Sequence, residues 1–325
     1  VDVFLPILVP QSLVNPGDVA RAIVENANKT EKTVLACMVG EKSLDEARRV
    51  LHENKVPMTI FPEVPGKVLG AMARYQNWLQ KGKSNHFDLD HIDRKAASSL
   101  FSKTNKKVFG EADTRPILEA YGMDLVPGGL AQDGLDAVKI AEKIGFPVAV
   151  KVVSDQVLHK SDLGGIALNL NSPGALKGAV NRIDDRIKQA APGAKIDGYL
   201  VEKMAPKGME VIVGMRRDPT FGPVMMFGLG GVYVELFKDV GFGVAPLSPD
   251  TALDMIFSTK AGTLLRGFRG GPVYDVDAVV EIIGRLSQLA LDFPQISEVE
   301  VNPLLVLPEG EGAKVLDARM LLEKE

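Results

Sequence analysis

Lys151 lies in the middle of an apolar run, residues 146–154, that reads FPVAVKVVS. A lysine is costly to bury without a partner, so this one has either an exposed position or a specific charged partner. An ammonium group held on a rigid strand is a point charge suited to a phosphate. For this residue alone, an exposed strand face and a phosphate contact are equally good interpretations.

The loop that follows favours the phosphate. Residues 157–166 read VLHKSDLGGI and contain His159, Lys160, Gly164 and Gly165. Paired glycines let a backbone approach an anion and donate N–H groups to it, and neutral imidazole is a nucleophile near pH 7. A solvated polar turn is the alternative. We predict that His159 is the catalytic residue and that the other three bind phosphate.

The next two apolar strands carry glutamates near their ends. YLVEKM contains Glu202 and Met204, and Glu210 is the second residue of MEVIVG. Carboxylates at strand ends can hold the amino group of a base or the hydroxyls of a ribose. An exposed edge carboxylate is an equally good interpretation for each. We predict that Glu202, Met204 and Glu210 contact a nucleotide.

A third group of polar residues stands near the end of the chain. EVEVNPLLVL contains Glu300 and Asn302, and KVLDARMLLE contains Asp317. Residues 300 and 302 share one strand face, and pairing of the two strands would add the aspartate. Carboxylate and amide oxygens are the ligands that Mg²⁺ prefers. We predict a magnesium site here, with a polar hairpin face as the alternative.

Composition bounds the classes of protein to which these residues can belong. The chain has 325 residues, of which 46% are hydrophobic and 25% charged, which is typical of a globular protein. Its net charge is −4, without the basic excess of a nucleic-acid binder, and no apolar run approaches the ~20 residues that cross a bilayer. The single cysteine suits a cytoplasmic protein.

Two architectures position these residues. In residues 1–82, apolar strands alternate with amphipathic helices. We predict strands at 3–9, 33–39 and 58–61, and helices at 18–28, 44–54 and 66–79. Continuous apolar strands between helices indicate a parallel sheet. Three such units are few, so this region is predicted to be an incomplete α/β domain of the flavodoxin-like type.

Residues 83–113 are polar and weakly periodic, and we predict a linker with a short helix around 94–101. From residue 114 the pattern is α+β, with adjacent strands that can pair antiparallel. We predict two lobes, at about 114–196 and 197–325.

These motifs, in this order, resemble an ATP-grasp domain. The resemblance is closer to one family, the NDP-forming acyl-CoA synthetases, which include the ADP-forming acetate–CoA ligases and are relatives of succinyl-CoA synthetase. The stretches that carry it read IGFPVAVKVVSDQVLHKSDLGGIALNL, PVMMFGLGGVYVELFKDVGFGVAPL, LLRGFRGGP and EVEVNPLLVLPEG with VLDARM. Gly243 stands where the family pattern has an arginine.

The resemblance implies that ATP or ADP binds between two lobes, with Lys151 on the phosphates and Mg²⁺ held by Asn302 and Asp317. It implies that His159 matches a second phosphoryl carrier. The family's principal phosphohistidine and its CoA-binding domain are expected upstream of Val1, in the same or a partner chain. The implied reaction converts a carboxylic acid, CoA and ATP to acyl-CoA, ADP and phosphate.

Two alternatives stay open. The chain is either this ligase part or an ATP-sensing regulatory module of a longer protein, which the expected absence of upstream residues favours. A carboxylate–amine ligase with an ATP-grasp domain is a third possibility, disfavoured by the βα-rich first 82 residues.

Overall fold

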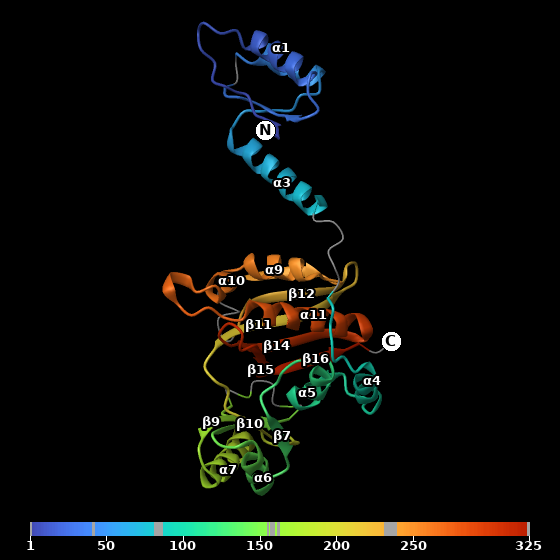
Figure 1. Cartoon of the computed structure of the whole chain (residues 1–325), viewed down its shortest axis with the longest axis vertical. Coiled ribbons are helices and arrows are strands. Elements are labelled where there is room, and N and C mark those ends of the chain that lie inside the picture. The colour runs from blue at the N-terminus through green and yellow to red at the C-terminus, as the bar shows by residue number, and fades with distance from the viewer. Residues whose placement is uncertain are drawn as a thin grey trace. The chain divides into compact units, whose positions relative to one another are not determined.

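The computed structural model describes residues 2–40, 43–80, 87–154, 156, 160, 163–230 and 239–323. They form two compact units, Val1–Lys83 and Ser84–Glu325 (Figure 1). No described helix is both long enough and apolar enough to cross a membrane.

The first unit is a small parallel α/β unit. Its helices are α1 (Pro16–Ala27), α2 (Asp45–Glu53) and α3 (Glu63–Gln80). Its strands are β1 (Val3–Phe4), β2 (Ile7–Leu8), β3 (Thr33–Val34), β4 (Ala36–Met38) and β5 (Met58–Thr59). Each described strand pair, β1–β3, β2–β4 and β4–β5, is parallel, which confirms the predicted sheet type. The predicted strand 3–9 divides around Pro6, which has no N–H to donate to a ladder.

The core of the first unit lies between the helices and the short strands. Met38 of β4 and Leu51 of α2 are fully buried there, together with Leu44 and Ala20. The start of α1 is fixed by Asn15, whose side chain accepts a hydrogen bond from the N–H of Gly17 at 2.9 Å.

The second unit is built on two antiparallel sheets, which confirms the predicted α+β class. The larger sheet has seven strands in the order β13-β12-β11-β14-β16-β6, with β15 beside β14. These strands are β6 (Val108–Phe109), β11 (Met209–Asp218), β12 (Gly222–Leu229), β13 (Val240–Val244), β14 (Ile296–Val306), β15 (Ala313–Val315) and β16 (Ala318–Leu322).

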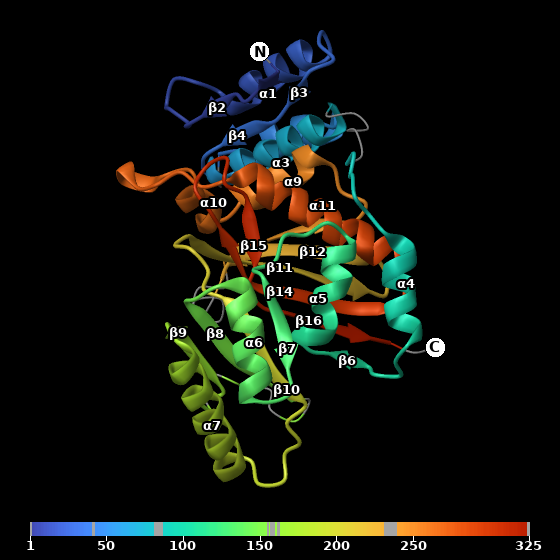
Figure 2. The same ribbon diagram turned by 60° about the horizontal axis from the view of Figure 1, so that its bottom comes forward.

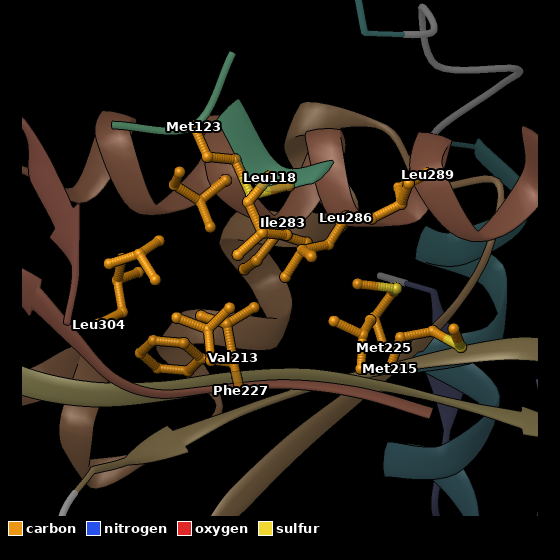
Figure 3. Packing of buried hydrophobic residues seen from close by; sticks show 14 of the residues in the cluster. Leu118, Met123, Val213, Met215, Met225, Phe227, Ile283, Leu286, Leu289 and Leu304 are labelled. Atoms are coloured by element: carbon orange, nitrogen blue, oxygen red, sulfur yellow. The ribbon is translucent and has the colours of Figure 1, made fainter. Parts of the chain in front are cut away.

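Helices cover the larger sheet and bury the main core. They are α4 (Arg94–Ser102), α5 (Glu111–Ala120), α9 (Pro249–Phe257), α10 (Lys260–Leu265), the 3-10 turn η1 (Phe268–Gly270) and α11 (Val276–Asp292). Figure 3 shows Ile283 and Leu286 of α11 and Leu118 of α5 pointing toward Val213 and Phe227 on the sheet. The tight packing of this core fixes α5 against the sheet.

The smaller lobe holds the other sheet, in the order β7-β10-β8-β9. Its elements are β7 (Gly128–Ala131), α6 (Gly134–Ile144), β8 (Val148–Val153), β9 (Ile166–Leu170), α7 (Pro173–Ala190) and β10 (Gly198–Lys203). Helices α6 and α7 lie side by side against this sheet (Figure 2). Their apolar faces and the strands make a separate core.

Two boundaries differ from the sequence prediction. The short helix expected around 94–101 is α4, but the expected linker 83–113 also contains β6, which is the edge strand of the larger sheet. The smaller lobe extends to Lys203 rather than ending near residue 196, because β10 pairs with both β7 and β8. Strand partners, which a single sequence does not reveal, decide both points.

Helix α5 also begins earlier than the apolar pattern indicates. The apolar residues of this segment favour a start at Arg115, but the structure starts the helix at Glu111. Glu111 and Thr114 of the first turn are polar and yet buried, so the pattern of apolar residues does not reveal this turn. This turn supplies Glu111 to the candidate site.

Candidate functional site

Lys151 is a buried lysine on the central strand β8. Its Nζ donates to Glu111 Oε1 and to the carbonyl oxygen of Leu316, both at 2.6 Å, and lies 2.8 Å from Glu202 Oε2. Burial by itself lowers the pKa of Lys151, but the carboxylates of Glu111, Glu202 and Asp317 outweigh it and hold the pKa above its usual value. The lysine is therefore a fixed, charged group, and the exposed-face interpretation is wrong.

Glu202 is buried on β10, with a side chain that is 3% exposed. Lys151 pairs with Leu200 and Ala149 pairs with Glu202 across the β8–β10 ladder, which puts the two charged side chains diagonally on one face. Burial raises the pKa of Glu202, while Lys151 opposes that rise. The interpretation of Glu202 as an exposed edge carboxylate is wrong.

Arg115 is the second cation of the cluster. Its Nη1 donates to Glu202 Oε1, and its Nη2 donates to the carbonyl oxygen of Val126. Both oxygens of Glu202 are thus paired, one with Arg115 and one with Lys151. Glu202 consequently holds Lys151 in place and ties α5 to the smaller lobe through Arg115, and neither of its oxygens is left unpaired.

Glu111 and Arg115 are not among the site residues predicted from the sequence. Both lie on α5, where the buried positions include 111, 115 and 118. These positions recur at the i, i+4, i+7 spacing of one helix face. Two charged residues on the same helix face as the apolar Leu118 could have indicated the site, because a charge on the buried face of a helix requires a partner.

The glycine loop is described in part. His159 lies outside the described residues, as do residues 155, 157–158 and 161–162. Lys160 Nζ lies 3.5 Å from Glu111 Oε2, so this predicted phosphate ligand lies beside the Lys151 cluster.

Gly164 and Gly165 have different conformational roles in that loop. Gly164 has φ +67°, the left-handed region that favours glycine. The N–H of Gly165 donates to the carbonyl oxygen of Lys160 at 2.7 Å. A Cβ on Gly165 would lie 2.7 Å from Val152 Cγ1 and 3.0 Å from the oxygen of Lys160. The N–H of Gly165 therefore holds the loop together rather than facing an anion.

Asp317 and Asn302 meet inside β14, where its pairing changes from β16 to β15. The backbone N–H of Asn302 donates to the carbonyl oxygen of Asp317 at 3.0 Å. Burial, followed by the nearby charge of Glu111, raises the pKa of Asp317 to about 7. Asp317 therefore interacts electrostatically with Glu111 and Lys151. Its sequence neighbour Leu316 accepts from Lys151, although the two residues are 165 positions apart.

Glu300 shares a strand face with Asn302, as predicted: Asn302 Nδ2 donates to Glu300 Oε1 at 3.3 Å. Its other oxygen, Oε2, accepts from Arg319 Nη2 at 3.0 Å. Within the described ranges, no group of three or more His, Cys, Asp or Glu residues is arranged to hold a metal ion. The oxygens of Asn302 and Asp317 are hard donors of the kind Mg²⁺ takes, and Glu300 is engaged by Arg319.

Met204 and Glu210 lie apart from the charged cluster in their contacts. Met204 Sδ accepts from the backbone N–H of Asn169 at 3.4 Å. Glu210 is exposed on β11, and its backbone oxygen accepts from the N–H of Gly230 at 3.1 Å. Within the described part of the chain, the hydrogen bonds and ion pairs of Lys151 do not extend to Glu210.

The arrangement concentrates charge at the contact between the lobes. Glu111 and Arg115 come from α5 on the larger sheet, and Lys151 and Glu202 come from the smaller lobe. Fixed ammonium groups beside acidic oxygens can bind an anionic phosphate together with a divalent cation. This is the chemistry of a nucleotide polyphosphate site.

Comparison with known proteins agrees with a nucleotide site. Residues 101–322 match the family model described as ATP-grasp domain. The chain is 39% identical over its full length to acetate–CoA ligase [ADP-forming] I of Archaeoglobus fulgidus, covering 46% of that protein. It thus spans about half the length of this curated relative.

Two further proteins are covered almost completely. The beta subunit of acetate–CoA ligase [ADP-forming] I of Pyrococcus furiosus is 39% identical over 68% of this chain and 94% of its own length. The acetyl-coenzyme A synthetase 1 of Ca. Korarchaeum cryptofilum, solved with coenzyme A and Ca-AMPCP, is 41% identical with a TM-score of 0.67. That match covers 71% of this chain and 99% of the other.

Proposed function

The chain belongs to the ATP-grasp family and, within it, to the ADP-forming acetate–CoA ligases, and on this premise we propose that it is the ATP-binding, phosphoryl-transferring part of an acid–CoA ligase. The observation that carries the proposal is the buried, charged Lys151 between the lobes, 2.6 Å from Glu111 and 2.8 Å from Glu202. Asp317 contributes to the same charge cluster.

The proposed reaction is reversible and runs through a phosphohistidine. An imidazole nitrogen bonds to the γ-phosphorus of ATP, and the bond to the departing ADP breaks. A substrate carboxylate oxygen then takes the phosphoryl group from the imidazole. The sulfur of CoA bonds to the acyl carbon, the thiol proton goes to solvent, and phosphate leaves with the former carboxylate oxygen as acyl-CoA forms.

In this reaction Lys151 and Lys160 neutralise phosphate oxygens through their ammonium groups. His159 is proposed as a phosphoryl carrier. Asn302 and Asp317 would hold Mg²⁺ through their side-chain oxygens, and that ion would neutralise further phosphate charge. Met204, Glu210 and the β10 strand that carries Glu202 are proposed to line the nucleoside side, and Gly164 and Gly165 to shape the phosphate loop.

The proposed partners are a carboxylic acid, CoA and a phosphohistidine segment in the same or another chain. The proposed location is the cytoplasm, because the one cysteine, Cys37, is a buried free thiol that suits a reducing compartment. The ligase names of the relatives favour catalysis over the regulatory alternative.

Titration calorimetry with MgADP, MgATP and the nucleotides in EDTA tests the binding site. We expect magnesium-dependent binding that Lys151→Ala abolishes and that Lys188→Ala, at an exposed lysine of α7, preserves. Absence of nucleotide binding, or binding unaffected by Lys151→Ala, contradicts the proposal.

Isotope exchange between ADP and ATP tests phosphoryl transfer. Exchange supported by the wild-type chain together with its phosphohistidine partner, and reduced by His159→Ala, is the expected result. A regulatory module would bind nucleotide and show no exchange.

A further inference from the structure

Glu111 is a buried carboxylate to which the proposed reaction gives no role. It begins α5, and its side chain is 4% exposed. Oε1 accepts from Lys151 at 2.6 Å, and Oε2 lies 3.5 Å from Lys160 Nζ. Oε2 accepts no hydrogen bond from the described part of the chain. One carboxylate therefore bridges the two lysines proposed to bind phosphate.

The hydrogen-bonding capacity of Lys151 is already filled. An ammonium group has three N–H donors. Lys151 Nζ has three acceptors within 2.8 Å, namely Glu111 Oε1, Glu202 Oε2 and the carbonyl oxygen of Leu316. A phosphate oxygen can receive a full hydrogen bond from Lys151 only when one of these acceptors gives up its place.

Glu111 is the acceptor that a phosphate can replace most readily. Glu202 is held by Arg115 as well as by Lys151, and the Leu316 oxygen belongs to the backbone. Glu111 has one oxygen without a hydrogen bond within the described contacts; its ion pairs are with the two lysines, and its further neighbour is the carboxyl group of Asp317. Because like charges repel, a phosphate and the Glu111 carboxylate cannot both lie beside Lys151 and Lys160 without a cost in free energy.

We propose that Glu111 is an internal counter-anion that occupies the lysine side of the phosphate site and that a nucleotide phosphate displaces from Lys151 and Lys160. The proposal rests on the proposed function, since it concerns the same site. Glu111 is a positioning residue, because it acts through the lysines. It holds both ammonium groups in place without ligand and weakens the affinity for any polyphosphate.

The proposal predicts opposite effects on stability and on binding. Glu111→Gln removes the charge with little change of shape. The ligand-free protein should lose stability because Lys151 loses a charged partner, while MgADP should bind about tenfold more tightly, the order of one charge-assisted hydrogen bond. A residue that only supports the fold would lower both together.

The experiment measures the Kd of MgADP and of tripolyphosphate by calorimetry, and the urea midpoint without ligand. The variants are Glu111→Gln and a control, Glu142→Gln, at an exposed glutamate of α6. The control should leave all three values unchanged. Tighter binding with a lower urea midpoint in Glu111→Gln supports the proposal, and equal or weaker binding overturns it.

Two additions keep the test decisive. If Glu111→Gln does not fold, Glu111→Asp, whose carboxylate is withdrawn from Lys151, takes its place under the same criteria. If tripolyphosphate binds and responds to Glu111 but MgADP does not bind, the proposed function fails and the role of Glu111 stands. If the variant and the wild type bind neither probe, both proposals are overturned.

Discussion

The two sides of the site hold the same kinds of side chain in opposite surroundings. Around Lys151, the carboxylates of Glu111 and Glu202 are 4% and 3% exposed. On the other side, Arg319 of β16 pairs with Glu300 of β14 and is 58% exposed. Charge pairs of similar length thus lie in a dry interior on one side and in solvent on the other.

This difference decides what each pair contributes. A buried charge that loses its partner is left without solvent, whereas an exposed one is rehydrated and screened. We infer that the Lys151 side sets the geometry of the site and that the Arg319 side adjusts it slightly. Four substitutions test this contrast.

Lys151→Met should have the largest effect on stability. It leaves two buried carboxylates without their shared cation, a loss of about 3–5 kcal/mol in the free energy of unfolding. Urea denaturation of the ligand-free protein measures it. Lys188→Met, which breaks an exposed pair with Asp184, is the control and should cost less than about 0.5 kcal/mol. Similar losses in both variants would remove the contrast between the two sides.

Asp317→Asn should change how stability depends on pH. The folded pKa of Asp317 is raised to about 7, so its protonated form favours the folded state. The stability from this group is complete below pH 4 and is lost as the pH rises through 7. Between these values, the variant should gain on the wild type by at most about 1.4 kcal/mol per pH unit.

Urea midpoints in EDTA at several pH values follow the difference between Asp317→Asn and the wild type. A difference that stays constant from pH 4 to 8 would show that Asp317 ionises as a solvated carboxylate. It would then belong with the exposed side of the site.

Gly165→Ala tests the loop that carries Lys160. The new methyl group would lie 2.7 Å from Val152 Cγ1 and 3.0 Å from a backbone oxygen, so either the loop or β8 must move. We expect a loss of about 1–3 kcal/mol by thermal or urea unfolding. Gly174→Ala on α7 is the control, because nothing lies within 4 Å of its Cβ position. Equal stability of the two variants would show that the loop has room.

Arg319→Ala should have the smallest effect. It removes two 3.0 Å contacts, to Glu298 and Glu300, on an exposed strand face. We expect a loss of about 0.2–1 kcal/mol that decreases as salt is added. A loss as large as that of Lys151→Met would show that this side is not rehydrated and would overturn the comparison.

Much of the fold follows from local patterns in the sequence. Helices α7 and α11 agree with the helical spacing of their apolar residues. Capping residues mark helix starts: the side chain of Ser172 accepts from the N–H of Ala175 at the start of α7. The strand bearing Lys151 was predicted for the same reason. These features depend on neighbours in the chain, which a sequence displays directly.

Other features escaped because their partners are distant in the chain. The edge strand β6 has two residues, too few to show a period, and is defined by pairing with β16. Strand β10 belongs to the smaller lobe because of its two neighbours in the sheet. The roles of Glu111 and Arg115 were hidden within an amphipathic helix whose polar residues are normally assigned to solvent.

The sequence by itself determined most of the longer elements, the class of each unit and the residue types that suit phosphate and magnesium. The tertiary structure decided which of those residues meet. Lys151 contacts Glu111 across 40 positions and Leu316 across 165, and Arg115 reaches Glu202 across 87. Periodicity reports which face of an element is apolar, but the ionisation and the partner of a buried charge depend on what packs against that face.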